Sequence, residues 1–265
     1  MRTLFFTLII CTLISCSKEP ARATNPYAVM VAAQATPDSL LNGIEETIMN
    51  TFTQSIARGK ATPMERLVSQ LEQGYQQTDQ NLYRYWQAYA LFYQAIFHMQ
   101  NQEEKPAEEI TDQAIQILKK LDAKTSEDFA LLALLQGFSI QFKPGLKAPF
   151  ISGRSGKNAT IAQEMNPENP RAYYVLGNND FYTPKQFGGG REVVTHLEKA
   201  IELAAQQPNN PYLPSWGAEN AYEMLMKYYA REGLDEKLQE TIDRAMQAFP
   251  GSYRLNQVVA QIEEG

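Results

Sequence analysis

Cysteine and histidine are nearly absent from this chain. Its 265 residues include two cysteines, Cys11 and Cys16, and two histidines, His98 and His196. The histidines are far apart and have no cysteine or acidic residue at metal-ligand spacing, so we predict no metal site and no cofactor. The sequence also lacks a Gly-x-Ser-x-Gly nucleophile elbow, and two isolated histidines give no support to a Ser-His-Asp triad. We therefore predict that the chain is not an enzyme.

An excess of basic residues is also missing. The chain has 24 Lys and Arg against 30 Asp and Glu, a formal net charge of −6. Removing residues 1–15, whose only charge is Arg2, would leave about −7. Nucleic acids and anionic membrane surfaces select for Lys and Arg. We therefore expect no nucleic-acid partner, and no anionic lipid surface as the main partner.

A strongly apolar run extends from Leu4 to Leu13, shortly after Arg2. A basic residue followed by a short apolar core is the layout of a signal peptide, predicted here as residues 1–15. A transmembrane helix needs roughly 20 apolar residues. The run is shorter than this, and the charged residues Lys18 and Glu19 follow closely, so we do not predict a membrane span.

The end of this run, Leu13-Ile14-Ser15-Cys16, resembles the lipobox of bacterial lipoproteins. The resemblance implies cleavage before Cys16 and acylation of that cysteine, for example with palmitate. It implies a lipid-anchored protein of the bacterial cell envelope, and Ser17 is compatible with the periplasmic side of the outer membrane. The alternative is an ordinary signal peptide with a chance cysteine. Lipidation would use the last thiol, so no disulfide is expected.

The rest of the chain divides into a tether and a helical domain. Residues 16–36 are rich in Ala, Pro, Asn and Thr without an apolar period, as in a flexible tether. In residues 37–265 apolar side chains recur every three or four positions, which indicates amphipathic helices. No stretch alternates apolar and polar residues between turn signals, so no strand is predicted. We predict an all-α domain of antiparallel helical hairpins.

The clearest hairpin, residues 219–252, resembles the tetratricopeptide repeat (TPR) family. Met226 and Leu238 stand where that family prefers small residues. Looser matches at about residues 82–121 and 170–205 extend the resemblance, which implies a TPR-like right-handed solenoid whose repeats stabilise one another. The strong match rests on Tyr222, Leu225, Met226, Tyr229, Gly233, Leu238, Ile242, Ala245 and Pro250.

A TPR-like solenoid implies a protein-protein interaction scaffold, with an envelope protein or a peptide as partner. In this family the concave face is lined by side chains of the first helix of each repeat. The alternative interpretation of the matching positions is ordinary polar surface. The residues are Arg84, Gln87 and Gln94 in one repeat, Arg171, Tyr174, Asn178 and Tyr182 in another, and Asn220, Glu223, Lys227 and Arg231 in the last.

A second pattern suggests a different function. Asn169-Pro170-Arg171, Gly177, Thr183-Pro184 and Phe187-Gly188-Gly189-Gly190 are similar to TPR-like bacterial lipoproteins, including the periplasmic T component associated with TRAP-type transporters. The resemblance implies a ligand-binding accessory lipoprotein of a transporter, with an enclosed pocket or a pore. This stays an alternative to the scaffold.

Two glycine-containing segments could bind anions. Gly153-Arg154-Ser155-Gly156-Lys157-Asn158 is not a P-loop, because Ile151 replaces the first glycine and Asn158 the Ser or Thr after the lysine. We interpret it as a flexible loop that leads into a helix from about residue 157. Gly188-Gly189-Gly190 could present N–H groups to an anion at a helix start. We favour the other interpretation, a hinge in which glycines allow positive φ.

Overall fold

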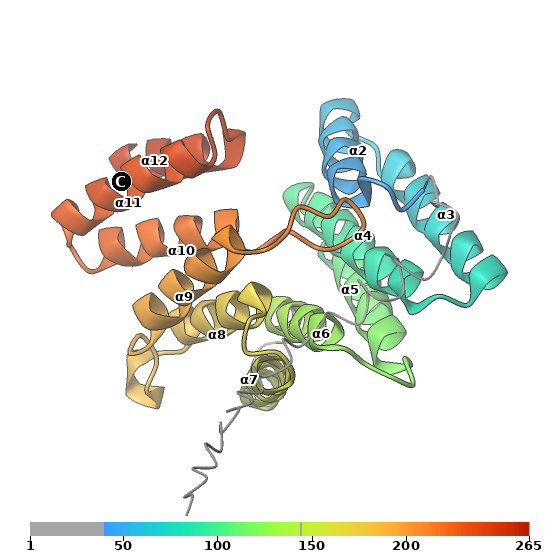
Figure 1. The fold of residues 1–265 in the computed structure, drawn as a ribbon, viewed down its shortest axis with the longest axis horizontal. Coiled ribbons are helices and arrows are strands. Elements are labelled where there is room, and N and C mark those ends of the chain that lie inside the picture. The colour runs from blue at the N-terminus through green and yellow to red at the C-terminus, as the bar shows by residue number, and fades with distance from the viewer. Residues whose placement is uncertain (1–39, 144, 265) are drawn as a thin grey trace, which may run out of the picture.

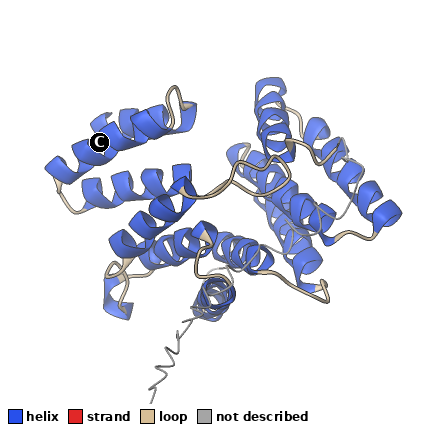
Figure 2. Cartoon of the chain, viewed as in Figure 1, coloured by secondary structure: helices blue, strands red, loops and turns tan. Residues whose placement is uncertain are grey.

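The structure is a computed structural model that describes residues 40–143 and 145–264. The predicted signal peptide, Cys16 and the tether lie outside the described residues. Within them the chain forms α-helices and two short 3-10 helices and no strand (Figure 2). The predicted all-α class is confirmed. No helix in this described part is long and apolar enough to cross a membrane.

The described helices pair into five antiparallel hairpins followed by a single C-terminal helix, α12 (Tyr253–Glu264). The 3-10 helices η1 (Ile140–Phe142) and η2 (Lys185–Phe187) lie in two of the connections. The first helices of the hairpins are α2 (Ile44–Arg58), α4 (Asn81–Gln100), α6 (Ser126–Ser139), α8 (Pro170–Tyr182) and α10 (Ala218–Arg231). The second helices are α3 (Thr62–Thr78), α5 (Glu104–Lys119), α7 (Lys147–Met165), α9 (Val193–Ala205) and α11 (Asp235–Ala248).

The hairpins stack side by side into a curved TPR-like solenoid (Figure 1). Each first helix packs against its own second helix and against the first helix of the next hairpin. The helix α12 packs on α10 and α11 and ends the stack. Because each hairpin leaves an apolar face for its neighbour, the stack buries a main core that runs from Leu41 to Tyr229, with a separate C-terminal cluster around Met226.

Glycine sets the closest approach between helices at two places. A Cβ atom on Gly177 of α8 would lie 2.7 Å from the side chain of Leu197 on α9. A Cβ atom on Gly74 of α3 would lie 2.1 Å from the ring of Tyr83 on α4. Both distances are shorter than van der Waals contact, so these helix pairs pack as closely as they do only because the residue is glycine.

The helix α4 lies at the centre of the core. It packs against α3, α5, α2 and α6, and Tyr85 and Trp86 are fully buried. This position explains why its aromatic residues cover more than one face, since a helix enclosed on several sides needs apolar residues on each of them. Most aromatic side chains of α4 are therefore core residues.

The interpretation of Gly153 to Asn158 as a flexible loop is wrong. These residues lie inside α7, which begins ten residues earlier than the sequence pattern indicates. Pro149 falls in the first turn of α7, where its missing N–H costs no intrahelical hydrogen bond. The small residues Ser155, Ala159 and Ala162 are buried and hold the helix against the domain. Tertiary packing thus outweighs the low helix propensity of the two glycines.

Candidate functional site

The predicted concave-face residues divide into a buried group and a more accessible group. Gln87, Gln94, Arg171 and Tyr174 are at most 7% exposed, so they are not open groove surface in this conformation. Arg84 is held within the N-terminal half, where its guanidinium lies 3.7 Å from the centre of the Tyr75 ring and pairs with Glu72. Their role in partner binding stays a prediction.

The long connection between α9 and α10, residues 206–217, contributes to the burial of Arg171 and Tyr174. It leaves the helix stack and crosses toward α2 and α4 (Figure 1). The backbone N–H of Gly43 donates to the carbonyl of Pro211 at 3.0 Å. The indole Nε1 of Trp86 donates to the carbonyl of Tyr212 at 3.1 Å. We call residues 206–217 the crossing segment.

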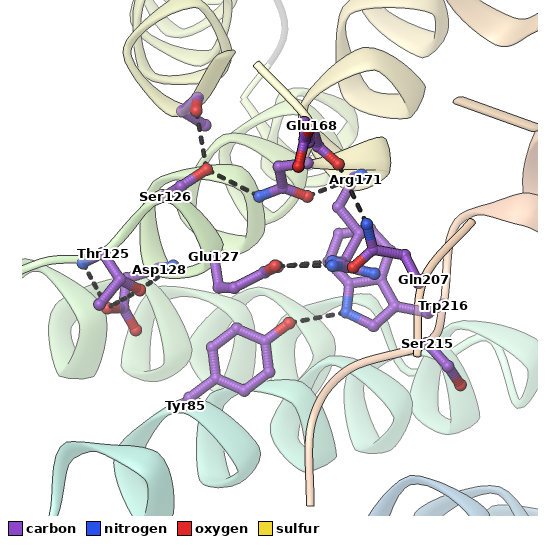
Figure 3. Close-up of polar contacts among 12 residues, drawn as sticks. Tyr85, Thr125, Ser126, Glu127, Asp128, Glu168, Arg171, Gln207, Ser215 and Trp216 are labelled. Carbon is purple, nitrogen blue, oxygen red and sulfur yellow. Dashed lines mark hydrogen bonds and ion pairs between the residues drawn. The ribbon is translucent and has the colours of Figure 1, made fainter. Parts of the chain in front are cut away.

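Trp216 anchors the end of the crossing segment. Its Nε1 donates to Tyr85 Oη at 2.7 Å (Figure 3), and its ring stacks on Tyr89 with centroids 5.8 Å apart. Tyr174 meets the same indole edge to face at 6.0 Å. Burial raises the pKa values of Tyr85, Tyr89 and Tyr174, so all three are neutral phenols at physiological pH. Trp216 therefore joins α4, α8 and the crossing segment.

A glutamate on α2 holds the neighbouring residue of the crossing segment. Glu45 Oε2 accepts a hydrogen bond from the backbone N–H of Ser215 at 2.6 Å and another from its hydroxyl at 3.2 Å. Burial raises the pKa of Glu45, while the hydrogen bonds from Ser215 and the charge of Arg171 oppose the shift. This carboxylate connects α2, the first helix of the described part, to a segment 170 positions later.

Arg171 belongs to a buried ion pair. Its Nε and Nη2 donate to the two carboxylate oxygens of Glu127 at 2.5 and 2.6 Å (Figure 3). Burial alone would lower the pKa of Arg171, but the Glu127 charge and its hydrogen bonds raise it. Asn169 caps α8 by accepting from the N–H of Arg171, and it donates to Ser126 on α6. The geometry gives Arg171 a structural position between α6 and α8.

The accessible group lies on α8 and α10. Tyr182 is 67% exposed, and Asn178, Asn220, Glu223 and Lys227 are partly exposed. The ammonium of Lys227 pairs with Glu223 one helical turn away. Arg231 is exposed, donates to the carbonyl of Phe181 and lies over the Phe181 ring at 4.1 Å. We call Asn178, Tyr182, Asn220, Glu223, Lys227 and Arg231 the α8–α10 face.

The glycine-rich connection between α8 and α9 is a tightly bonded turn. Gly188 and Gly190 have φ angles of 91° and 83°, which favour glycine. A Cβ atom on Gly189 would lie 1.9 Å from the carbonyl oxygen of Thr183. All three glycine N–H groups donate to carbonyls of Asp180, Pro184 or Lys185. These groups are already used within the protein, so they are not free to bind an anion.

A large open cavity lies beside the crossing segment. Its volume is about 770 Å³, and its walls combine carboxylates and side-chain amides with apolar surface. This cavity opens to solvent, so it is not the enclosed pocket that the resemblance to a transporter component implied. No group of three His, Cys, Asp or Glu among the described residues could hold a metal ion. The polar lining residues include Glu45, Glu46, Glu168, Asn166, Gln206, Gln207, Asn209 and Asn210.

The two histidines lie away from this cavity. His98 Nδ1 and Glu103 Oε2 are 2.5 Å apart at the α4–α5 connection. His196 on α9 lies beside the ring of Tyr173, and burial lowers its pKa. Neither residue lines the cavity, so neither can bind a ligand there.

The sequence indicates the crossing segment by its length and composition, which the helical periodicity does not show. The segment contains Pro208, Pro211 and Pro214, and it is longer than most connections between packed helices, which have about 2 to 8 residues. Tyr212 and Trp216 within such a connection indicate a segment that packs on the domain. Their partners Trp86 and Tyr85 on α4 could not be predicted, because they lie 126 and 131 positions away.

Comparisons with known proteins agree with the helical architecture. TTC0263, a thermophilic TPR protein from Thermus thermophilus, is 13% identical with a TM-score of 0.52, and the match covers 83% of this chain and 100% of that chain. The fold is TPR-like. The HusA haemophore from Porphyromonas gingivalis is 23% identical with a TM-score of 0.51, covering 71% of this chain and 93% of HusA.

The family model described as the C-terminal domain of the HTH-type transcriptional regulator Rgg matches residues 37–130, about a third of the chain. No curated protein matches the sequence. At these sequence identities the solved structures support only the fold of this chain. The binding functions in their names are those of the matched proteins.

Proposed function

We propose that this protein is a lipid-anchored scaffold of the bacterial envelope, which holds a protein or peptide partner on its TPR-like domain. The observation that carries the proposal is the α8–α10 face. It offers an exposed aromatic ring, amides and both signs of charge on two packed helices, a combination that suits recognition of a polypeptide.

The crossing segment restricts where such a partner binds. It covers the region around Tyr85, Tyr89 and Tyr174, so an extended peptide does not run along the whole concave side. The accessible binding surface is the C-terminal part of the solenoid. Membrane anchoring through Cys16 is supported by the lipobox-like sequence and the apolar run before it.

A crosslinked pull-down from membranes tests the binding face. We expect a stoichiometric partner with the wild-type chain, and at least a tenfold lower yield after the combined changes Asn178→Ala, Tyr182→Ala and Lys227→Ala. The matched control, Lys105→Ala with Tyr253→Ala, alters exposed residues on other helices and should leave the yield unchanged. Equal recovery with both variants would remove the α8–α10 face as the binding site.

Metabolic labelling with a palmitate analogue tests the anchor. The wild-type protein should incorporate label, and the Cys16→Ser variant should not. Label in the Cys16→Ser variant, or none in the wild type, contradicts lipidation at this position.

The 770 Å³ cavity favours a second candidate function, small-molecule binding by an accessory lipoprotein of a transporter. HusA is named as a haemophore. The described residues that line the cavity include no His, Cys, Met or Tyr, so they do not fit haem iron, and the amides and carboxylates suit a polar ligand. Native mass spectrometry should then show a retained small molecule that is lost on Glu46→Gln with Asn209→Ala. An unliganded mass for the wild type would count against this candidate.

A further inference from the structure

The outer side of α7 carries basic and apolar residues on a single stripe. Lys147, Phe150, Arg154 and Lys157 follow one another at three- and four-residue spacing, which places them on one face of the helix. Leu146 precedes them directly. Leu146 is 90% exposed and Phe150 is 73% exposed. We call these five residues the α7 stripe.

The stripe is not the packing face of the helix. The domain contacts of α7 use Ser155, Ala159 and Ala162, which are all fully buried. Ser155 donates to the carbonyl of Ala133 on α6 at 2.7 Å. The exposure of Phe150 is therefore not offset by contacts with another part of the described chain.

The charge around the stripe is opposite to that of the chain as a whole. Lys147, Arg154 and Lys157 form no ion pair with a described residue. A shallow groove of about 490 Å³ brings Lys119 and Lys143 beside Lys147 and Arg154, and Asp112 is the one carboxylate among its described lining residues. Lys143 pairs with Asp112 and with Glu108, so four positive charges meet two negative charges and the region carries +2, in a chain of net charge −6.

We propose that the α7 stripe rests on an anionic phospholipid surface. Lys147, Arg154 and Lys157 would contact lipid phosphates, while Leu146 and Phe150 would enter the boundary between headgroups and acyl chains. Clustered Lys and Arg are attracted to anionic lipids by about 1 kcal/mol each near the surface, and burial of the exposed Leu and Phe side chains at the interface would add to this attraction. The net charge of −6 argues against a membrane surface only for the chain as a whole, and the stripe reverses that sign locally.

The charge complementarity favours lipid over an acidic protein. The cations are spread over nearly three turns of an exposed helix, and the two apolar side chains lie together at its first turn. Binding to a membrane surface depends on buried apolar area and on attraction to anionic lipids, and it needs no shape-complementary pocket. The inference builds on the proposed anchor, because the 24 chain steps from Cys16 to Leu40 span at most about 80 Å and would keep the domain near the bilayer.

Vesicle flotation with residues 17–265 tests the proposal without the anchor. This chain keeps all residues of the described core, which begins at Leu41. Circular dichroism checks that it is folded before flotation. We expect it to float with vesicles of phosphatidylethanolamine and phosphatidylglycerol, and not with vesicles of phosphatidylcholine alone. Added salt should reduce flotation, because the Debye length falls to about 3 Å at 1 M.

Two variants separate the contributions of charge and insertion. Lys147→Glu with Arg154→Glu should weaken binding at least about 25-fold, since each cation near an anionic surface contributes about a fivefold change. Leu146→Ser with Phe150→Ser should weaken binding to the same vesicles without changing its salt dependence. The charge-matched control Lys60→Glu with Lys105→Glu should bind like the wild-type chain.

Absence of flotation with the anionic vesicles, or equal binding of the stripe variant and the control, would overturn the proposal. A protein captured by the wild type and lost with Lys147→Glu and Arg154→Glu, without vesicle binding, would instead assign the stripe to a protein partner. The palmitate-labelling result is independent, because residues 17–265 carry no Cys16.

Discussion

The indole Nε1 of Trp216 donates to the phenol oxygen of Tyr85 across 131 positions of sequence. Trp216 is 6% exposed and Tyr85 is fully buried, so neither group has bulk water as an alternative partner. The bond joins the crossing segment to the central helix α4. Its contribution to stability can be measured directly.

We expect Trp216→Ala to lower the free energy of unfolding by about 3–5 kcal/mol, because it removes a large buried ring from contact with Tyr89 and Tyr174. Tyr85→Phe keeps the ring but leaves the indole N–H without its acceptor, which should cost about 1–3 kcal/mol. Urea denaturation measures both. A loss below about 0.5 kcal/mol for Trp216→Ala, the range of ordinary surface changes, would show that the crossing segment is only loosely attached.

The buried pair Arg171 and Glu127 should be sensitive to loss of one partner. Arg171→Met leaves the Glu127 carboxylate buried without its bidentate donor and should cost about 3–5 kcal/mol. Arg171→Met with Glu127→Leu removes both charges and should recover most of that loss. Thermal denaturation of the single and double variants checks this. A double variant no more stable than Arg171→Met would contradict the explanation.

The pH dependence of stability should contain a contribution from Glu45. Burial raises its pKa in the folded state, so the folded chain holds this proton more tightly than the unfolded chain. The resulting stabilisation is present below the ordinary value of 4.5 and is lost as the pH rises through the folded-state pKa. The Glu45→Gln variant has no such loss.

The stability of the Glu45→Gln variant relative to wild type should therefore increase between about pH 4 and pH 7. Urea unfolding at several pH values measures this difference. Glu46→Gln removes the same charge from an exposed neighbouring position and is the matched control. If the stability of Glu45→Gln relative to wild type fell as the pH rises, the expected direction of the Glu45 effect would be wrong.

The glycine-rich turn should tolerate substitution much less than the glycines of α7. Gly189→Ala would place a methyl group 1.9 Å from the Thr183 carbonyl oxygen, so the turn must shift, and unfolding should become easier. Gly153→Ala adds a methyl group to open space within a helix and should stabilise by about 0.5–1 kcal/mol. Differential scanning calorimetry measures the direction of the stability change for both variants. Equal effects at the two positions would contradict the packed turn.

The sequence predicted the fold class because apolar periodicity is a local property. The clearest repeat, near residues 219–252, corresponds to α10 and α11, although Met226 and Leu238 replace small residues of the TPR pattern. Met226 is fully buried in the C-terminal cluster with Tyr222 and Ala245. The larger side chains are accommodated there by packing that a repeat pattern does not describe.

The accessibility of the concave-face residues could not be predicted in the same way. TPR spacing places Gln87, Arg171 and Tyr174 on the inner side of first helices. Arg171 and Tyr174 are buried partly by Glu127 and Trp216, which are distant in sequence, and Gln87 bonds to Glu72 on the preceding helix. The prediction of a loop at residues 153–158 was wrong for a related reason, since only tertiary contacts show that α7 continues through these residues.

The crossing segment also changes how this solenoid should unfold. In a simple repeat array each unit touches only its neighbours, so the ends can fray while the middle remains folded. Here Gly43 and Glu45 of the first hairpin bond to Pro211 and Ser215, which lead into the last hairpin. These bonds close a loop through the array. Loss of either end therefore disturbs the other, which gives a one-dimensional stack the cooperativity of a globular domain.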